Sequence, residues 1–147
     1  MTRRRRAAGR PGSLKEKGAV AVEFALVLPI FLVLVLGIVE FSRAFNIQVS
    51  LSEAARETAR YTAIHYADAS FSTATAQGVG VSAAPSVALA PGNINISYSG
   101  GSACAAGDSV IVTVNFATPY MTGFPALIPG MPASLNISSK GVMRCGG

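Results

Sequence analysis

Residues 18–39 read GAVAVEFALVLPIFLVLVLGIV, an apolar run that holds one charged side chain, Glu23. The stretch from Ala19 to Val39 has 21 residues. As a helix that rises about 1.5 Å per residue it covers about 31 Å, which matches the hydrocarbon core of a bilayer, about 30 Å thick. The run therefore predicts one membrane-spanning helix over residues 19–39, and no second segment of the sequence is comparably long and apolar.

Two residues inside the run are unusual for a plain membrane anchor. Glu23 places a carboxylate in an apolar helix at a cost of about 2–3 kcal/mol on insertion scales, so it calls for a partner or a function. Pro29 removes the amide that would bond to the carbonyl of Ala25, and its ring clashes with that turn. We expect a kink or weak point at Pro29; the alternative is a proline that the membrane helix tolerates without a role.

The positive charge of the chain is concentrated before the apolar run. Residues 1–18 contain seven Lys and Arg residues and one Glu, which gives this leader a charge of +6, whereas the whole chain carries +5 and the remainder therefore −1. The leader is rich in Arg, Gly and Pro and lacks periodicity, so we expect it to be disordered. Cytoplasmic flanks of membrane helices are enriched in Lys and Arg, so we expect the leader in the cytoplasm and everything after Glu40 outside. The five basic residues beyond the run form no stripe, and direct binding of nucleic acid is not expected.

Helix is predicted to continue outside the membrane over residues 40–66, which are rich in helix formers and lack Gly and Pro. Oppositely charged residues three apart support this helix as surface pairs. The pairs are Glu40 with Arg43, Glu53 with Arg56, and Glu57 with Arg60. On the opposite face alanine recurs every fourth residue, which lets another helix or a sheet approach closely. These alanines are Ala55, Ala59 and Ala63.

Residues 67–147 predict a small β-rich domain. Apolar and polar residues alternate in three stretches, which indicates short antiparallel strands. The stretches are residues 94–98, 110–116 and 135–137. About 80 residues make only a small independent core, so the strands are expected to bury their apolar face on the outer half of the long helix. The predicted fold class is α+β, a long N-terminal helix packed against a small antiparallel sheet.

Two further segments of this domain are less regular. The sequence allows a short amphipathic helix over residues 71–83, although Gly78 and Gly80 weaken it. Residues 119–132 contain four prolines and predict a loop, whose apolar side chains can cover an edge of the core. These side chains are Met121, Phe124, Leu127 and Ile128.

The chain has two cysteines, Cys104 and Cys145, separated by 41 residues. In an oxidising compartment such a pair favours one disulfide, worth about 3–4 kcal/mol if unstrained; the alternative is two free thiols. The single histidine and the absence of a CxxC spacing argue against a metal site, and no cofactor is expected.

The segment Lys17-Gly18-Ala19-Val20-Ala21-Val22-Glu23-Phe24-Ala25-Leu26-Val27-Leu28-Pro29 resembles the TadE-like family, the pilin-like proteins of tight-adherence (Flp-type) pilus systems. Further residues carry the same resemblance: Gly37, Glu40, Phe41, Ala54-Ala55-Arg56 and Ala59-Arg60. The resemblance implies a pilin-like fold in the bacterial cytoplasmic membrane, cleavage between Gly18 and Ala19 by a prepilin peptidase, and an assembly role for Glu23 and Phe24. It also implies other pilins and inner-membrane pilus assembly proteins as partners. The β-rich outer region favours a minor pilin or pseudopilin, acting in pilus assembly or adhesion, over the main filament subunit.

Cleavage at this point would create a charge that Glu23 can neutralise. The new α-amino cation at Ala19 lies four residues before Glu23, on the same helix face. In hydrocarbon the two charges are tolerable mainly as a pair, within one chain or between packed neighbours. The alternative is that Glu23 reaches the headgroup level without a specific partner.

Three other classes of protein compete with this interpretation. A secreted domain with a signal peptide fits poorly, because the run is longer than the apolar region of a typical signal peptide and no clean small-x-small site follows it before the charged helix at Glu40. A single-pass anchored protein that never enters a filament stays open. An enzyme is not expected, because His65, Asp68 and Asp108 lie in no nucleophile-elbow or Gly-rich pattern.

Overall fold

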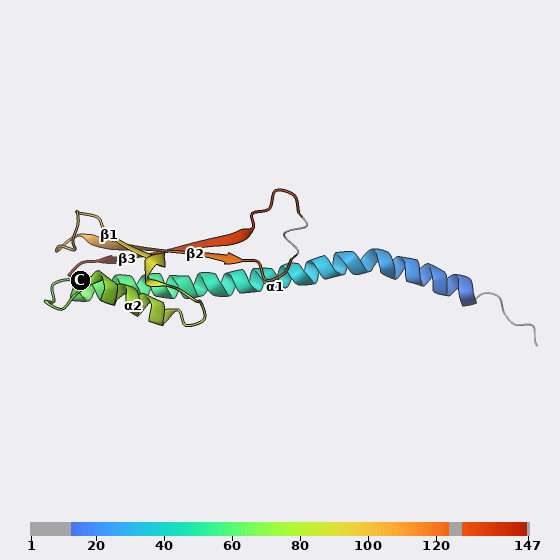
Figure 1. The fold of residues 1–147 in the computed structure, drawn as a ribbon, viewed down its shortest axis with the longest axis horizontal. Helices are drawn as coiled ribbons and strands as arrows, with labels where there is room; N and C mark the ends of the chain where they lie inside the picture. Colours follow the sequence, from blue (N-terminus) through green and yellow to red (C-terminus); the bar gives the residue numbers. More distant parts are fainter. Residues whose placement is uncertain (1–12, 124–127, 147) are drawn as a thin grey trace, which may run out of the picture. The chain divides into compact units, whose positions relative to one another are not determined.

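The computed structural model describes residues 13–123 and 128–146, with side chains described from Lys17 onward. In chain order its elements are α1 (Ser13–His65), α2 (Thr73–Ala83), the 3-10 helix η1 (Pro91–Asn93), β1 (Ile94–Tyr98), β2 (Ser109–Pro119) and β3 (Ser134–Arg144) (Figure 1). The fold is α+β, as predicted. The chain divides into two compact units, one ending at Ile38 and one beginning at Val39, and each is described by itself.

In the first unit, α1 begins earlier than the sequence suggested. The expectation of disorder over residues 1–18 is wrong for residues 13–18, which are helical; residues 1–12 lie outside the described part of the chain. The physical reason is that Leu, Lys and Glu at positions 14–17 are good helix formers that extend an existing helix without a new nucleation cost. The helix also runs through Pro29 without interruption, and the kink expected there stays a prediction.

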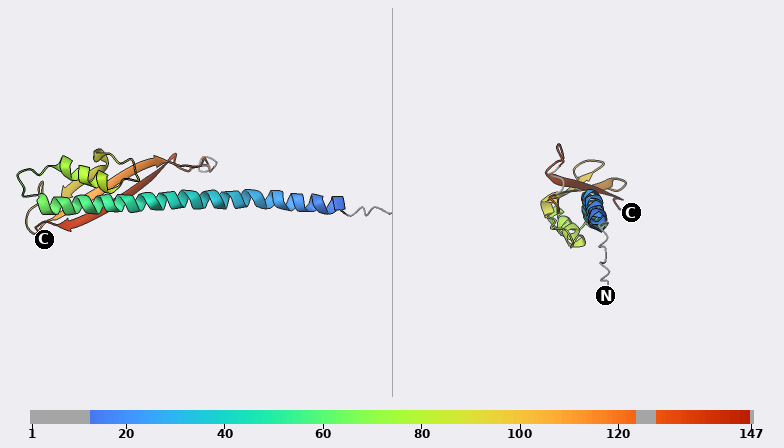
Figure 2. Two further views of the ribbon diagram at one scale, coloured as in Figure 1. Left: turned by 90° about the horizontal axis from the view of Figure 1, so that it is seen from below. Right: turned by 90° about the vertical axis from the view of Figure 1, so that its right-hand side faces the viewer.

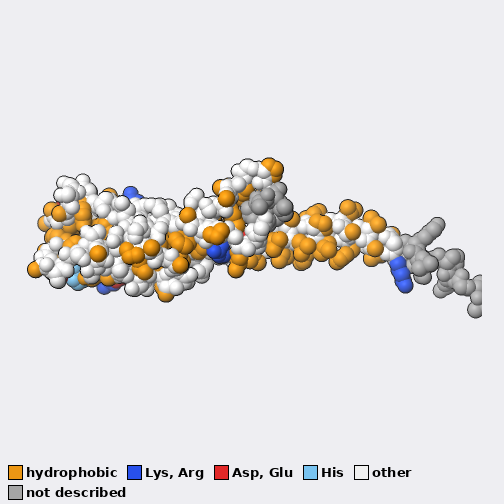
Figure 3. Space-filling view, viewed as in Figure 1, with side chains coloured by type: hydrophobic (Ala, Val, Ile, Leu, Met, Phe, Trp, Pro, Cys, Tyr) orange, Lys and Arg blue, Asp and Glu red, His pale blue; other side chains and the backbone are white. Residues whose placement is uncertain are grey.

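The surface of this first unit is apolar. Every large apolar side chain from Val20 to Ile38 is exposed by a third or more, and by length and composition the helix could cross a membrane. Figure 3 shows these side chains as a continuous hydrophobic surface. A soluble monomer rarely exposes so much contiguous apolar surface, so this part of α1 is suited to lipid.

The second unit contains a three-stranded antiparallel sheet in the order β1-β2-β3. In its register Ile96 lies opposite Val112, and Val112 lies opposite Gly141 on the other side. The predicted strands are all present, but β2 and β3 are each 11 residues long and extend beyond the apolar alternation. Backbone pairing with β2 carries β3 across Ser138, Ser139 and Lys140, which give no hydrophobic signal.

One face of the sheet packs on the outer half of α1, as predicted. The alanine face is buried against the sheet, and Leu51 and Val112 are fully buried in the same core. Contact is close because β3 carries a glycine where it crosses the helix: a Cβ at Gly141 would lie 2.5 Å from the carbonyl oxygen of Ala55. Helix α2 packs against both α1 and β1 through Gly80, where a Cβ would collide with Thr58 and Ile94 (Figure 2).

Two sequence expectations about side chains are wrong. Among the described residues only Glu57 and Arg60 form an ion pair, at 3.7 Å and well exposed. Glu40 instead binds Thr122 in the β2–β3 loop, and Arg43 binds the end of β2. Met121 and Ile128 do not cover a core edge, since both are exposed. Phe124 and Leu127, predicted to share that role, lie outside the described residues.

The predicted disulfide is present between Cys104 and Cys145, whose Cα atoms lie 5.9 Å apart. It joins the segment before β2 to the residue that follows β3, and both cysteines are buried. The amide of Gly146 donates to the carbonyl oxygen of Ala63 at 3.5 Å, so the end of the chain is fixed beside the end of α1.

Candidate functional site

The predicted cleavage position lies on the exposed surface of α1 in the first unit. Gly18 and Ala19 are both helical and exposed. A Cβ placed on Gly18 would meet no atom within 4 Å, so nothing in the folded unit requires glycine there.

Glu23 lies one turn further along the same helix, on an apolar face. Its neighbours on that face are Val20, Phe24 and Val27, which line a shallow open hollow with it. Phe24 is 63% exposed. Within the described part of the chain Glu23 has no ion-pair partner. The face therefore presents one carboxylate, surrounded by apolar side chains, to whatever covers it.

A polar contact that the sequence did not predict lies at the start of the second unit. Glu40 Oε1 accepts hydrogen bonds from the backbone amide of Thr122 at 2.6 Å and from its hydroxyl at 3.0 Å. One turn on, Arg43 donates to the Pro119 carbonyl at 2.8 Å and to the Thr118 hydroxyl at 2.9 Å. These four bonds fix the loop end of β2 to α1. The i,i+3 spacing of Glu40 and Arg43 suggested a local pair and concealed this long-range role.

The backbone amide of Thr122 holds the pKa of Glu40 below its ordinary value of 4.5. Desolvation opposes this shift, whereas the Thr122 hydroxyl and the nearby Arg43 reinforce it. The carboxylate therefore stays ionised at neutral pH, directly after the residues predicted to span the membrane.

This contact should weaken in acid. A carboxyl whose pKa is lowered by folding stabilises the fold fully above its unfolded pKa, and that stabilisation is lost as the pH falls through the folded pKa. We expect the protection of the Thr122 amide against hydrogen exchange, corrected for the intrinsic rate, to fall below about pH 4.5. In Glu40→Ala, which removes both acceptor oxygens, the protection should be low at every pH; equal protection of Thr122 in the variant and the wild type at neutral pH would contradict the contact.

His65, one of the residues considered for catalysis, contacts Tyr61 one turn earlier on its own helix. The ring of His65 stacks on Tyr61 with centroids 4.2 Å apart, and its Nδ1 lies 3.0 Å from the carbonyl oxygen of Tyr61. In the described ranges no three His, Cys, Asp or Glu side chains are grouped so that they could hold a metal ion.

The two units together define the class of protein: a helix apolar enough to cross a membrane, continued by a small α+β unit closed by a disulfide. Residues 18–60 match the family model described as TadE-like protein. This segment is therefore TadE-like, as the sequence resemblance indicated, and it associates the chain with tight-adherence (Flp-type) pilus systems and with the membrane. The match includes Gly18, Ala19, Glu23, Phe24 and Pro29. Comparison with curated proteins and with solved structures gave no match.

Proposed function

We propose that this protein is a minor pilin or pseudopilin of a tight-adherence pilus, and not an enzyme. A prepilin peptidase removes residues 1–18, and the protein then acts in pilus assembly or adhesion with other pilins and inner-membrane assembly proteins. The carrying observation is Glu23, a carboxylate without an ion-pair partner in the described chain, on an apolar helix face five residues after Gly18 in the TadE-like segment.

The leader supplies a physical reason for cleavage. Its charge of +6 holds the chain in the membrane with its N-terminus in the cytoplasm, because moving each cation through hydrocarbon is strongly unfavourable. Once the leader is removed, the apolar helix can leave the bilayer lengthwise. The same step leaves a cation on Ala19, four residues from Glu23, and so supplies the charge that this carboxylate lacks.

Because the predicted cleavage position lies inside a helix, cleavage requires the helix to open locally. The bond between Gly18 and Ala19 lies within α1, so the peptidase must act on a locally opened form of the helix. Glycine lowers helix stability by about 1 kcal/mol relative to alanine, and Gly18 therefore makes this opening easier. The apolar residues that follow are held in the membrane, which keeps the opening local.

The test is the N-terminus of the protein from native membranes. We expect mass spectrometry to find a mature chain that begins at Ala19, and Gly18→Ala to accumulate the uncleaved form, as in a strain without the peptidase. Gly37→Ala is the matched control, because Gly37 lies in the same helix and a Cβ there also meets no atom within 4 Å. Normal cleavage of Gly18→Ala, or normal cleavage without the peptidase, would refute this processing; a mature N-terminus beyond Glu40 would indicate a signal peptide.

A further inference from the structure

We infer that the β2–β3 loop is a second membrane contact, whose apolar side chains lie in the headgroup region of the bilayer that α1 spans. The loop surface consists of Tyr120, Met121, Ile128 and Met131, all outside the range 124–127, about which nothing is assumed. The inference rests on the membrane-spanning part of the proposed function and is independent of the pilus. Its partner is a lipid surface.

The position of the loop follows from its attachment to α1. Residues 19–39 match the thickness of the hydrocarbon core, so Glu40 is the first residue beyond it. Thr122 is bonded to Glu40 through both its amide and its hydroxyl, and Pro119 is held by Arg43. These contacts lie within the second unit and place the start of the loop, up to Thr122, beside the residue at which the helix leaves the membrane.

The side chains at this position are of the kind that interfaces favour. Met121 is 68% exposed, Met131 is 46% exposed and Ile128 is 40% exposed, and none of the three belongs to the buried core. In Figure 3 hydrophobic side chains gather on the part of the loop that projects from the second unit. Tyr is enriched where membranes meet water because its ring is apolar and its hydroxyl is polar.

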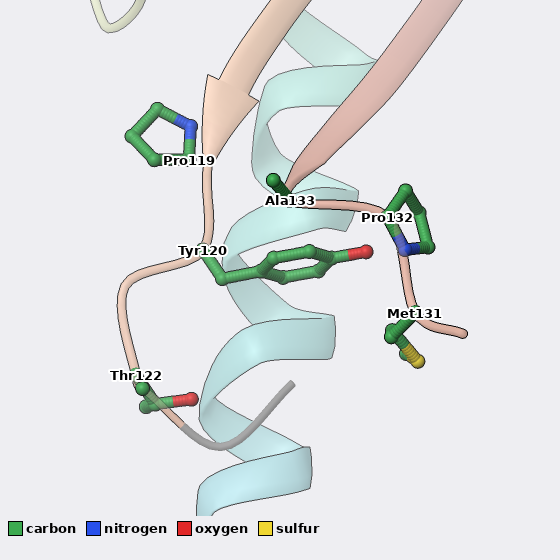
Figure 4. A pocket seen from close by; sticks show the side chains of 7 residues that line it. Pro119, Tyr120, Thr122, Met131, Pro132 and Ala133 are labelled. Carbon is green, nitrogen blue, oxygen red and sulfur yellow. The ribbon is translucent and has the colours of Figure 1, made fainter. Parts of the chain in front are cut away.

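The hollow between the two arms of the loop is also free of charge. A cavity of about 340 Å³ is lined by residues of both arms, and none of them is charged. Figure 4 shows the ring of Tyr120 extending from the β2 arm toward Pro132 and Met131 on the β3 arm. The whole segment 119–133 contains no Lys, Arg, Asp or Glu, so its entry into the interface requires no charged loop residue to leave water.

The charged group beside the loop, the Glu40 carboxylate, has hydrogen-bond partners within the loop. The Glu40 carboxylate accepts two hydrogen bonds from the loop itself, and its charge lies near Arg43. The loop therefore covers the one acidic group at the exit of the helix and turns apolar side chains outward. A second copy of the chain could cover the same side chains, and the experiment distinguishes this outcome.

The experiment uses the full chain in vesicles of phosphatidylethanolamine and phosphatidylglycerol. Since Cys104 and Cys145 are joined, one introduced cysteine can be labelled with an environment-sensitive fluorophore without reduction. The loop variants are Met121→Cys and Ile128→Cys. Ile30→Cys reports the middle of the span, and Glu53→Cys is an exposed control that lies about 20 Å further along the helix than Glu40, at about 1.5 Å per residue.

We expect blue-shifted emission from both loop labels, with stronger quenching by shallow than by deep lipid-borne quenchers, and the reverse order at residue 30. Loop labels that behave like residue 53, while residue 30 is quenched, would overturn the loop contact and leave the membrane span intact. Loop labels shielded only at high protein-to-lipid ratio, without lipid quenching, would show that another copy covers the loop and would overturn the inference. An unquenched label at residue 30 would refute the membrane span itself.

Discussion

If the protein enters the filament as proposed, we expect Glu23→Ala to reduce its amount in sheared pilus fractions by about 10²- to 10³-fold, while membrane insertion and leader cleavage continue. The reason is that removal of one partner of a buried charge pair leaves the other unpaired, at a cost of about 3–5 kcal/mol, and each 1.4 kcal/mol is a tenfold change in equilibrium. Insertion is unaffected because the substitution makes the helix more apolar. The measurement is a quantitative immunoblot of sheared and membrane fractions.

The matched control for this substitution is Glu53→Ala. Glu53 is exposed on α1, and in the described part of the chain it makes no ion pair. Glu40 is unsuitable as a neutral control, because its carboxylate holds Thr122. Equal amounts of Glu23→Ala and wild type in the sheared fraction would show that Glu23 has no assembly role. Absence of the wild type from that fraction would favour a pseudopilin that stays in the membrane.

Gly141→Ala destabilises the outer unit by about 3 kcal/mol, at the upper end of what overpacking typically costs. The added Cβ would lie 2.5 Å from the carbonyl oxygen of Ala55 and 2.6 Å from its carbon, so helix and sheet must separate. Both atoms belong to the backbone of α1, and no side-chain rotation relieves the contact. For a unit of about 100 residues this corresponds to a fall in Tm of about 10–20 °C.

Two glycines make this prediction specific. At Gly80 an added Cβ meets the end of the Ile94 side chain and the buried Thr58 hydroxyl, whose rotation would break its bond to the Ala54 carbonyl oxygen, so Gly80→Ala should also destabilise the unit. At Gly92 the Cβ meets nothing within 4 Å, and Gly92→Ala should be nearly neutral. Thermal unfolding of the full chain in detergent, followed by near-ultraviolet circular dichroism, gives all three values. A Tm for Gly141→Ala equal to that of Gly92→Ala would contradict the close approach.

The parts of the fold that sequence reasoning predicted are those with a strong local signal. The apolar run, the alanine spacing and the two-residue period of β2 each follow from neighbours in sequence, and all three led to the observed element. The middle of β3 carries the polar residues Ser138, Ser139 and Lys140, and their strand conformation depends on pairing with β2, which no local pattern reveals. In the sequence Gly141 suggests only a weaker strand. The structure shows that the glycine lets β3 pack closely against α1.

The candidate site divides in the same way. Gly18, Ala19, Glu23 and Phe24 belong to one short motif, so the sequence alone could locate them. The bond between Glu40 and Thr122 joins residues 82 apart in the chain. A nearby Arg43 offered Glu40 a plausible local partner. Only the folded arrangement shows that Glu40 holds the start of the β2–β3 loop and that Arg43 holds the end of β2.

The disulfide has a consequence for how the protein withstands proteolysis. Cys104 and Cys145 enclose β2, the loop and β3 in one covalent ring. Exposed loops are the preferred places for extracellular proteases to cut, and the proline-rich loop lies within this ring. A single cut there opens the ring without releasing either piece, because the C-terminal strand stays attached through Cys145 to a chain anchored by α1. The protein can thus be cut once in this loop and still keep every strand of its sheet.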